Sequence, residues 1–132
     1  MSELAFVAKR SPIHGTGLFA ATMVPRRMKL GELSGSVVRV RAILAAMRAR
    51  AVIHLVEFGD GWGLDCSAGN HFRHLNHSCQ ATCYLRVVAR RVEIYSRGPL
   101  AAGRELTVDY RESQHQGGMT CGCGVAGCRA RI

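Results

Sequence analysis

The sequence has little lysine, few aromatic residues and only three prolines. Of its 18 basic residues, only Lys9 and Lys29 are lysine, and the aromatic share is 6%. No apolar run approaches the roughly eighteen residues that span a bilayer, which excludes a membrane-spanning helix from the prediction. Apolar residues make up 48% of the 132, which excludes wholesale disorder. The length predicts one domain with a hydrophobic core.

The N-terminal stretch carries Glu3 and lacks the basic-then-apolar order of a secretory signal. Without an export signal, the six cysteines indicate reduced thiols or a metal site rather than a disulfide framework. An intracellular location is therefore expected, either the cytoplasm or, in a eukaryote, the nucleus and its chromatin.

The net charge of +9 is carried almost wholly by arginine. An arginine-rich surface can bind nucleic-acid phosphates or acidic partners. The arginines are scattered and are not interleaved with aromatic residues, so a solvated basic surface is the simpler interpretation. Nucleic-acid binding is only weakly supported, no membrane partner is predicted, and the oligomeric state cannot be read from the sequence.

One stretch, Arg73-His-Leu-Asn76-His77-Ser-Cys79, concentrates polar chemistry in seven residues. Burying such groups without partners costs about 1–3 kcal/mol each, so they need a structured environment. Two later segments offer one: Glu105–Tyr110, and the cysteine cluster that begins at Cys121. We expect the three segments to meet in space.

Hydrophobic periodicity predicts a mostly β chain. From Val40 to Ala51, apolar positions follow helical spacing and predict one amphipathic helix. A hairpin is expected to turn at Gly59-Asp-Gly61, and a second at Arg90-Arg91. The remaining predicted strands cover residues 4–9, the apolar run after Gly17, short pieces around Gly31 and Gly35, and the approach to Tyr110.

The cysteines near the C-terminus have metal-ligand spacing. Cys121, Cys123 and Cys128 form C-x-C-x4-C, separated by small residues that let the backbone curl around an ion. Structural zinc takes four ligands and favours thiolates, so a fourth ligand must come from elsewhere. The candidates are Cys66, Cys79, Cys83 or a histidine.

Four separated motifs resemble those of SET-domain protein lysine methyltransferases with a post-SET zinc motif, in that family's order. They cover the chain from about Ser11 to Ile132. The motifs are the turn His14-Gly15-Thr-Gly17-Leu18-Phe, the signature Gly69-Asn-His-Phe-Arg73-His-Leu-Asn76-His77-Ser-Cys79, the segment Glu105-Leu-Thr-Val-Asp-Tyr110, and the cysteine cluster followed by Arg129. Four motifs in order are strongly specific.

The resemblance implies a compact SET-type fold, a β-clip of short strands with one short helix, a knot-like core and a zinc-bound C-terminal tail. It places a SET domain at residues 1–112 and a post-SET cysteine-rich tail at 113–132. The implied activity is transfer of a methyl group from S-adenosylmethionine to a lysine side chain of a histone or another protein.

The resemblance also implies site residues. The family's post-SET zinc uses the cysteine of the central signature, so the implied ligands are Cys79, Cys121, Cys123 and Cys128. Tyr110 matches the active-site tyrosine, which would orient the methyl group and the amine for in-line displacement. The implied cofactor-binding residues are His14, Gly15, Gly17, Leu18, Arg73, Asn76, His77 and Tyr110.

Other roles remain open for three of these residues. Asn76 and His77 can serve as internal hydrogen-bond partners that hold the core. Arg73 can serve as a structural partner of Glu105 or Asp109. The paired glycines of the turn allow positive φ and close approach of a ligand to the backbone, although a tight turn alone also explains them.

The chain departs from the family pattern at several places, among them Ala81-Thr82, where the family often has Pro-Asn. Leu33 stands where the family often has a tyrosine, His74 replaces a phenylalanine, and Val108 lies where a larger aromatic can limit the number of methyl groups added. The loss of the aromatic at Leu33 permits a second hypothesis, a SET-like binding or scaffold module without turnover. A zinc-stabilised nucleic-acid binder is a third, and it leaves Tyr110 unexplained.

Overall fold

The structure is a computed structural model that describes residues 5–42 and 55–109. In these ranges the chain forms ten short strands, one short 3-10 helix and the beginning of another helix at residues 40–42, so the predicted mostly β class is confirmed. The strands are β1 (Phe6–Arg10), β2 (Thr16–Ala20), β3 (Lys29–Leu33), β4 (Ser36–Arg39), β5 (Leu55–Glu57), β6 (Trp62–Asp65), β7 (Asn76–His77), β8 (Cys83–Val88), β9 (Arg91–Ser96) and β10 (Glu105–Val108), and the 3-10 helix is η1 (His71–His74).

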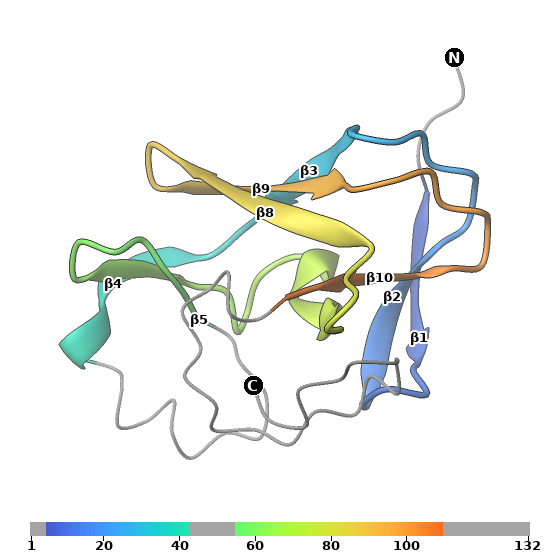
Figure 1. Cartoon of the computed structure of the whole chain (residues 1–132). Coiled ribbons are helices and arrows are strands. Elements are labelled where there is room, and N and C mark those ends of the chain that lie inside the picture. Colours follow the sequence, from blue (N-terminus) through green and yellow to red (C-terminus); the bar gives the residue numbers. More distant parts are fainter. Residues whose placement is uncertain (1–4, 43–54, 110–132) are drawn as a thin grey trace.

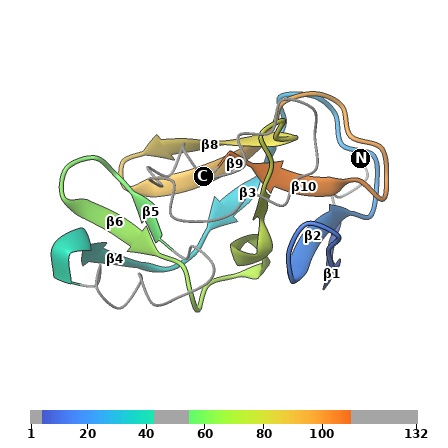
Figure 2. The ribbon, with the colours of Figure 1, turned by 60° about the horizontal axis from the view of Figure 1, so that its bottom comes forward.

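The strands form three small sheets. Their orders are β1-β2-β10-β7, β3-β9-β8 and β4-β6-β5. The first and third sheets lie at opposite ends of the molecule, and the β3-β9-β8 sheet spans the distance between them (Figure 1; Figure 2). Helix η1 lies near the middle, so the central signature occupies the centre of the fold (Figure 1).

Buried and more exposed residues alternate along β9, which shows which face of the middle sheet is turned toward the core. Val92, Ile94 and Ser96 are all 0% exposed, whereas the residues between them are at least partly exposed. The hairpin with β8 turns at Ala89 and Arg90, which have φ of 50° and 61°. The turn predicted at Arg90-Arg91 is therefore wrong by one residue. Arg91 pairs with Val88 because that register keeps Val92 facing the core.

Helical structure agrees with the prediction only in part. Residues 40–42 are helical, so the expected helix begins at Val40, and its remainder lies outside the described residues. Helix η1 was not expected. Its N-cap is Asn70, whose side-chain oxygen accepts a hydrogen bond from the Phe72 N–H, and four residues are too few to show a helical period.

The core has two hydrophobic clusters. The larger one gathers buried side chains from β2, β9 and β10, among them Leu18, Ile94 and Leu106, around Phe72 of η1. The smaller one lies beneath the β4-β6-β5 sheet and includes Val56 and Leu64. Leu33 stands where the family often has a tyrosine. Its side chain packs against both clusters, so in this protein the position connects the two parts of the core.

A network of charged side chains crosses the outer face of the middle sheet. Glu32 accepts hydrogen bonds from Arg91 at 2.6 and 2.9 Å and from Lys29 at 3.0 Å. Arg91, and then Lys29, lower the pKa of the Glu32 carboxyl from 4.5 to about 2. Because this pKa is depressed in the folded state, the carboxylate stabilises the fold above pH 4.5, and that contribution is lost as the pH falls toward about 2.

The lowered pKa of Glu32 predicts that the effect of removing its charge depends on pH. At pH 7, Glu32→Gln should unfold at a lower urea concentration than the wild type. The difference should shrink below pH 4.5 and vanish only below pH 2, because the Glu32 carboxyl, with a pKa of about 2, is still half ionised at pH 2. Urea denaturation at several pH values measures it, and a difference that does not shrink between pH 7 and pH 2 would show that the carboxylate charge is not the cause.

Candidate functional site

The two signature segments lie side by side. Strand β7 pairs in parallel with β10, with Asn76 opposite Thr107 and His77 opposite Val108. The Ser78 N–H donates to the Val108 carbonyl at 3.1 Å and continues the ladder. This confirms that the central stretch and the segment from Glu105 meet, whereas the cysteine tail and Tyr110 lie outside the described residues.

Strand β10 also brings in the glycine turn. It pairs with β2 on its other side, with Glu105 opposite Phe19 and Leu106 opposite Leu18. Leu18 is 0% exposed between β1 and β10, so only the backbone near it is a candidate for contacting a cofactor. The first strands of the chain and the central signature are therefore joined through one short strand.

A pair of threonines locks β10 against the start of β8. The Thr82 N–H donates to the Thr107 hydroxyl, and the Thr107 N–H donates to the Thr82 hydroxyl, both at 3.0 Å. The Thr82 hydroxyl also donates to the Glu105 carbonyl at 3.0 Å. Threonine hydroxyls here take the place of the backbone-to-backbone hydrogen bonds of a sheet. The backbone groups of Thr82, Glu105 and Thr107 are therefore paired where the chain leaves the central signature.

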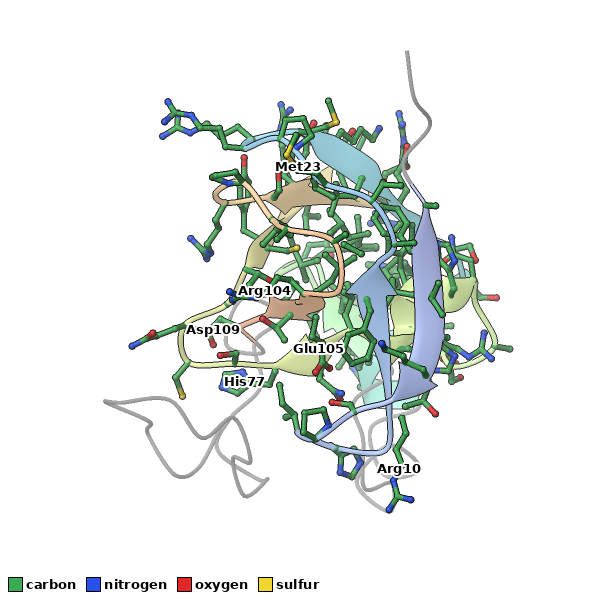
Figure 3. The ribbon with its side chains drawn as sticks, turned by 90° about the vertical axis from the view of Figure 1, so that its right-hand side faces the viewer. Arg10, Met23, His77, Arg104, Glu105 and Asp109 are labelled. Atoms are coloured by element: carbon green, nitrogen blue, oxygen red, sulfur yellow. The ribbon has the colours of Figure 1, made fainter. Side chains whose placement is uncertain are left out.

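Side chains from two distant segments converge on the Glu105 carboxylate. The Ser11 hydroxyl lies 2.8 Å from both carboxylate oxygens, and the Asn76 amide donates to Oε2 at 3.0 Å. Figure 3 shows Glu105 pointing into the molecule, away from Arg104. Within the described residues, Glu105 forms no ion pair with a basic side chain. Neutral donors satisfy this carboxylate.

Gly15 and Gly17 of the turn are glycine for different structural reasons. Gly15 has φ of +44° with open space where a Cβ would lie. At Gly17, a Cβ would lie 2.3 Å from the Glu105 Oε2 atom and 2.9 Å from the Ser11 Cβ. The predicted close approach to the backbone is therefore real at Gly17, but the group that approaches is the Glu105 carboxylate of the protein itself.

The internal role predicted for Asn76 and His77 is confirmed. The Asn76 amide donates to the His14 carbonyl at 2.9 Å as well as to Glu105, so it ties the glycine turn to the central signature. The His77 Nε2 lies 3.4 Å from the Cys79 Sγ, and its Nδ1 lies 3.7 Å from the Asp109 Oδ1. His77 and Asp109 face each other in Figure 3.

Arg73 does not contact the predicted carboxylates. Its guanidinium donates to the Gly69 carbonyl at 2.7 Å and to the Asn70 carbonyl at 3.4 Å. Helix η1 turns the side chain back over its own loop, and Ser11 and Asn76 take the expected place beside Glu105. The interpretation of Arg73 as a partner of Glu105 or Asp109 is wrong. Its predicted role in cofactor binding stays a prediction.

The described cysteines have different environments. Cys66 is buried in the smaller cluster and Cys83 in the larger one, and burial raises the pKa of each thiol to about 11. Cys79 is only partly buried and lies beside His77. Zinc needs a deprotonated, accessible thiol, so Cys79 fits the fourth position better than Cys66 or Cys83. Among the described residues, no three potential ligands form a metal site.

Ser11 is the site residue that sequence reasoning missed. The sequence predicted only a strand before it, over residues 4–9, and β1 ends at Arg10. Ser11 is 8% exposed, and its hydroxyl also accepts the Ile13 N–H at 3.0 Å. Its importance depends on a carboxylate 94 positions away, and no local signal indicates that contact.

Removing the shared carboxylate should loosen the site. Glu105→Ala leaves the Ser11 hydroxyl and one Asn76 amide hydrogen without an acceptor, so we expect a loss of about 2–3 kcal/mol in unfolding free energy. Urea denaturation measures this loss.

Gly17→Ala provides a matched test of the same contact. In the wild-type background its Cβ collides with the Glu105 carboxylate, but in the Glu105→Ala background most of that clash is absent. The double variant should therefore be more stable than the sum of the two single effects predicts. Strict additivity would contradict the contact.

Comparisons with known proteins agree with this architecture. The model of the SET domain family matches residues 15–111. The chain is 32% identical over 135 residues to Histone-lysine N-methyltransferase set-2 of Caenorhabditis elegans, covering 93% of this chain and 9% of that protein. It is 30% identical over 133 residues to Histone-lysine N-methyltransferase SETD1 of Drosophila melanogaster, covering 93% of this chain and 8% of that protein.

A yeast relative has similar coverage. The chain is 29% identical over 135 residues to the Histone-lysine N-methyltransferase, H3 lysine-4 specific, of Saccharomyces cerevisiae, covering 91% of this chain and 12% of that protein. The chain thus spans only about a tenth of the length of these relatives. Because the family match covers well over half of the chain, this chain belongs to the SET-domain family.

Proposed function

We propose that this chain is an S-adenosylmethionine-dependent protein-lysine N-methyltransferase of intracellular location. One observation carries the proposal: parallel pairing of β7 with β10 brings Asn76 and His77 beside the segment that leads into Tyr110. The family match supports it, and so do relatives whose names state histone-lysine methylation. Within the described residues, no helix has the length and apolar character to cross a bilayer.

The glycine turn fits the cofactor. His14, Gly15 and Thr16 are exposed, and a Cβ at Gly15 would meet no atom within 4 Å, so the turn has an open side. Asn76 holds the His14 carbonyl, which keeps the turn in a fixed position before any ligand arrives. We expect the backbone of residues 14–18, with Arg73, Asn76 and His77, to hold S-adenosylmethionine.

Methyl transfer requires alignment and a neutral lysine amine. S-adenosylmethionine supplies an electrophilic methyl group on a sulfonium. Free lysine has a pKa near 10.4, so the enzyme must favour the uncharged amine through a narrow apolar channel. The Tyr110 hydroxyl would orient the amine and the methyl group. Val108 is 4% exposed within the larger cluster, and the number of methyl groups added stays a prediction.

A zinc ion bound by the C-terminal tail is the second part of the proposal. Cys79 would supply one thiolate and Cys121, Cys123 and Cys128 the other three, which would draw the tail toward His77 and the site. Thiolate ligands suit a closed structural zinc site. The ion would then order the end of the chain beside the substrate channel.

Zinc content tests this ligand set. Wild-type protein should contain about one zinc per chain, and Cys79→Ser should lose most of it because a structural site needs all four ligands. Elemental analysis of purified protein measures the content. Cys66→Ala is the control and should retain zinc, because Cys66 is buried in the core. Equal zinc in the Cys79→Ser protein would remove Cys79 from the site.

The function is tested by methyl transfer from labelled S-adenosylmethionine to purified histones and to a protein extract, followed by amino-acid analysis of the labelled product. Methyllysine is the expected product. Cofactor binding by calorimetry without any transfer would favour the scaffold hypothesis. Neither binding nor transfer in zinc-replete protein would contradict the proposal.

A further inference from the structure

Two loops at one end of the molecule form a second surface, which adjoins the candidate site because Arg104 directly precedes Glu105. The loops are residues 21–28 and 97–104, and the exposed side chains that we group as the loop-end surface are Met23, Arg26, Arg27, Met28 and Arg104. Met23 is 69% exposed and Met28 is 37% exposed. In Figure 3, Met23 lies near the top of the molecule, His77 toward the bottom, and Arg104 between them.

The loop-end surface is rigid. The backbones of Val24 and Leu100 exchange two hydrogen bonds of 2.8 Å across the loops. Ser96, which is 0% exposed, fixes the first loop from below. Its hydroxyl donates to the Pro25 carbonyl at 2.6 Å and accepts from the Met28 N–H at 3.0 Å. A docking partner would therefore meet a surface that loses little conformational entropy on binding.

One residue of the surface is held in an unfavourable backbone conformation. Arg27 has φ of 52°, a left-handed value that is unfavourable for a residue with a side chain. Its N–H donates to the Ser96 carbonyl at 2.9 Å, which maintains that conformation. Glycine would fit the backbone better, so stability does not explain the arginine. Such strain is often found at binding sites.

Charged side chains on and beside the middle sheet pair with one another. The ion pairs of Arg86, Arg90 and Arg91 are with Glu93, Asp60 and Glu32, and all of these lie on or beside the middle sheet. Neither loop of the loop-end surface contains an acidic residue. Within the part of the chain that the structure describes, Arg26, Arg27 and Arg104 form no ion pair, so their charges are available to an acidic group from outside.

We propose that the loop-end surface docks an acidic protein segment that also carries an apolar side chain. The arginines would bind its carboxylates, and the flexible thioether side chains of Met23 and Met28 would cover the apolar anchor. A nucleic-acid backbone would use the arginines but would gain little from two exposed methionines. The combination of charge and apolar area therefore favours a protein partner.

Fluorescence anisotropy with three labelled probes tests the proposal on the full chain. The probes are a peptide of alternating glutamate and leucine, a peptide of alternating glutamate and serine, and a short DNA duplex. The glutamate–leucine peptide should bind most tightly. Replacing Arg26 by glutamine together with Arg27→Gly should weaken it by about fivefold to tenfold, and so should Met23→Ser.

The controls separate docking from general charge attraction and from unfolding. Arg27→Gly relieves the backbone strain, so its urea midpoint should not fall while binding does. Arg86→Gln removes one positive charge from the middle sheet and should leave binding unchanged. The proposal is overturned if no peptide binds, if Arg86→Gln weakens binding as much, or if the duplex binds more tightly and is indifferent to Met23→Ser.

Discussion

Replacing Tyr110 by phenylalanine is expected to lower methyl transfer by about 100-fold or more while S-adenosylmethionine still binds. The change removes one hydroxyl and keeps the ring, so it alters the alignment of amine and methyl group without emptying the site. Misplacement of reacting groups by about 1 Å can cost this much in rate. Single-turnover transfer from labelled cofactor, with binding measured by calorimetry, gives both quantities.

Tyr84→Phe is the matched control for this prediction. Tyr84 is stacked on Tyr95 on the middle sheet, with ring centroids 5.5 Å apart and no part in the candidate site. The same loss of a hydroxyl there should leave transfer unchanged. Full activity in the Tyr110→Phe protein would show that the hydroxyl does not align the reactants, whereas loss of cofactor binding would show that the hydroxyl acts in holding S-adenosylmethionine instead.

Gly69→Ala is expected to destabilise the protein by about 3 kcal/mol or more, which is a large effect for one methyl group. A Cβ at Gly69 would lie 2.2 Å from the Ser34 carbonyl oxygen and 3.1 Å from the Cys66 carbonyl oxygen. Both are backbone atoms, so no side-chain rotation relieves the clash. The adjacent Asn70 N–H donates to the Ser34 hydroxyl at 2.8 Å, so the same shift would disturb the N-cap of η1.

Because η1 leads directly into Asn76 and His77, cofactor binding should weaken together with stability in the Gly69→Ala protein. Urea denaturation and calorimetry measure the two effects. Gly98→Ala is the control, since a Cβ there meets no atom within 4 Å, and it should change neither. A Gly69→Ala protein as stable as the Gly98→Ala protein would show that the loop accommodates the clash.

Most strands could be predicted because their residues alternate locally. The predicted hairpin turn at Gly59-Asp-Gly61 is confirmed between β5 and β6, and the pieces around Gly31 and Gly35 are strands β3 and β4. Failures occurred where the local pattern was ambiguous. Helix η1 is too short to show periodicity, and the β8–β9 turn uses Ala89 and Arg90 in left-handed conformations that neither residue type indicates.

The sequence by itself determined that this is a mostly β chain with the SET-domain motifs, because strand periodicity and short motifs are encoded within a few neighbouring residues. It also determined that Asn76 and His77 would need internal partners, since buried polar groups are rarely left unpaired. The catalytic role of Tyr110 and zinc binding by the cysteine tail stay predictions.

Only the tertiary structure decided which partners are used. It placed Ser11 and Asn76 on the Glu105 carboxylate, turned Arg73 back onto the Gly69 carbonyl, and buried Cys66 in the smaller hydrophobic cluster. These contacts join residues that are far apart in the chain, and they depend on strand register and packing, which no short stretch of sequence specifies.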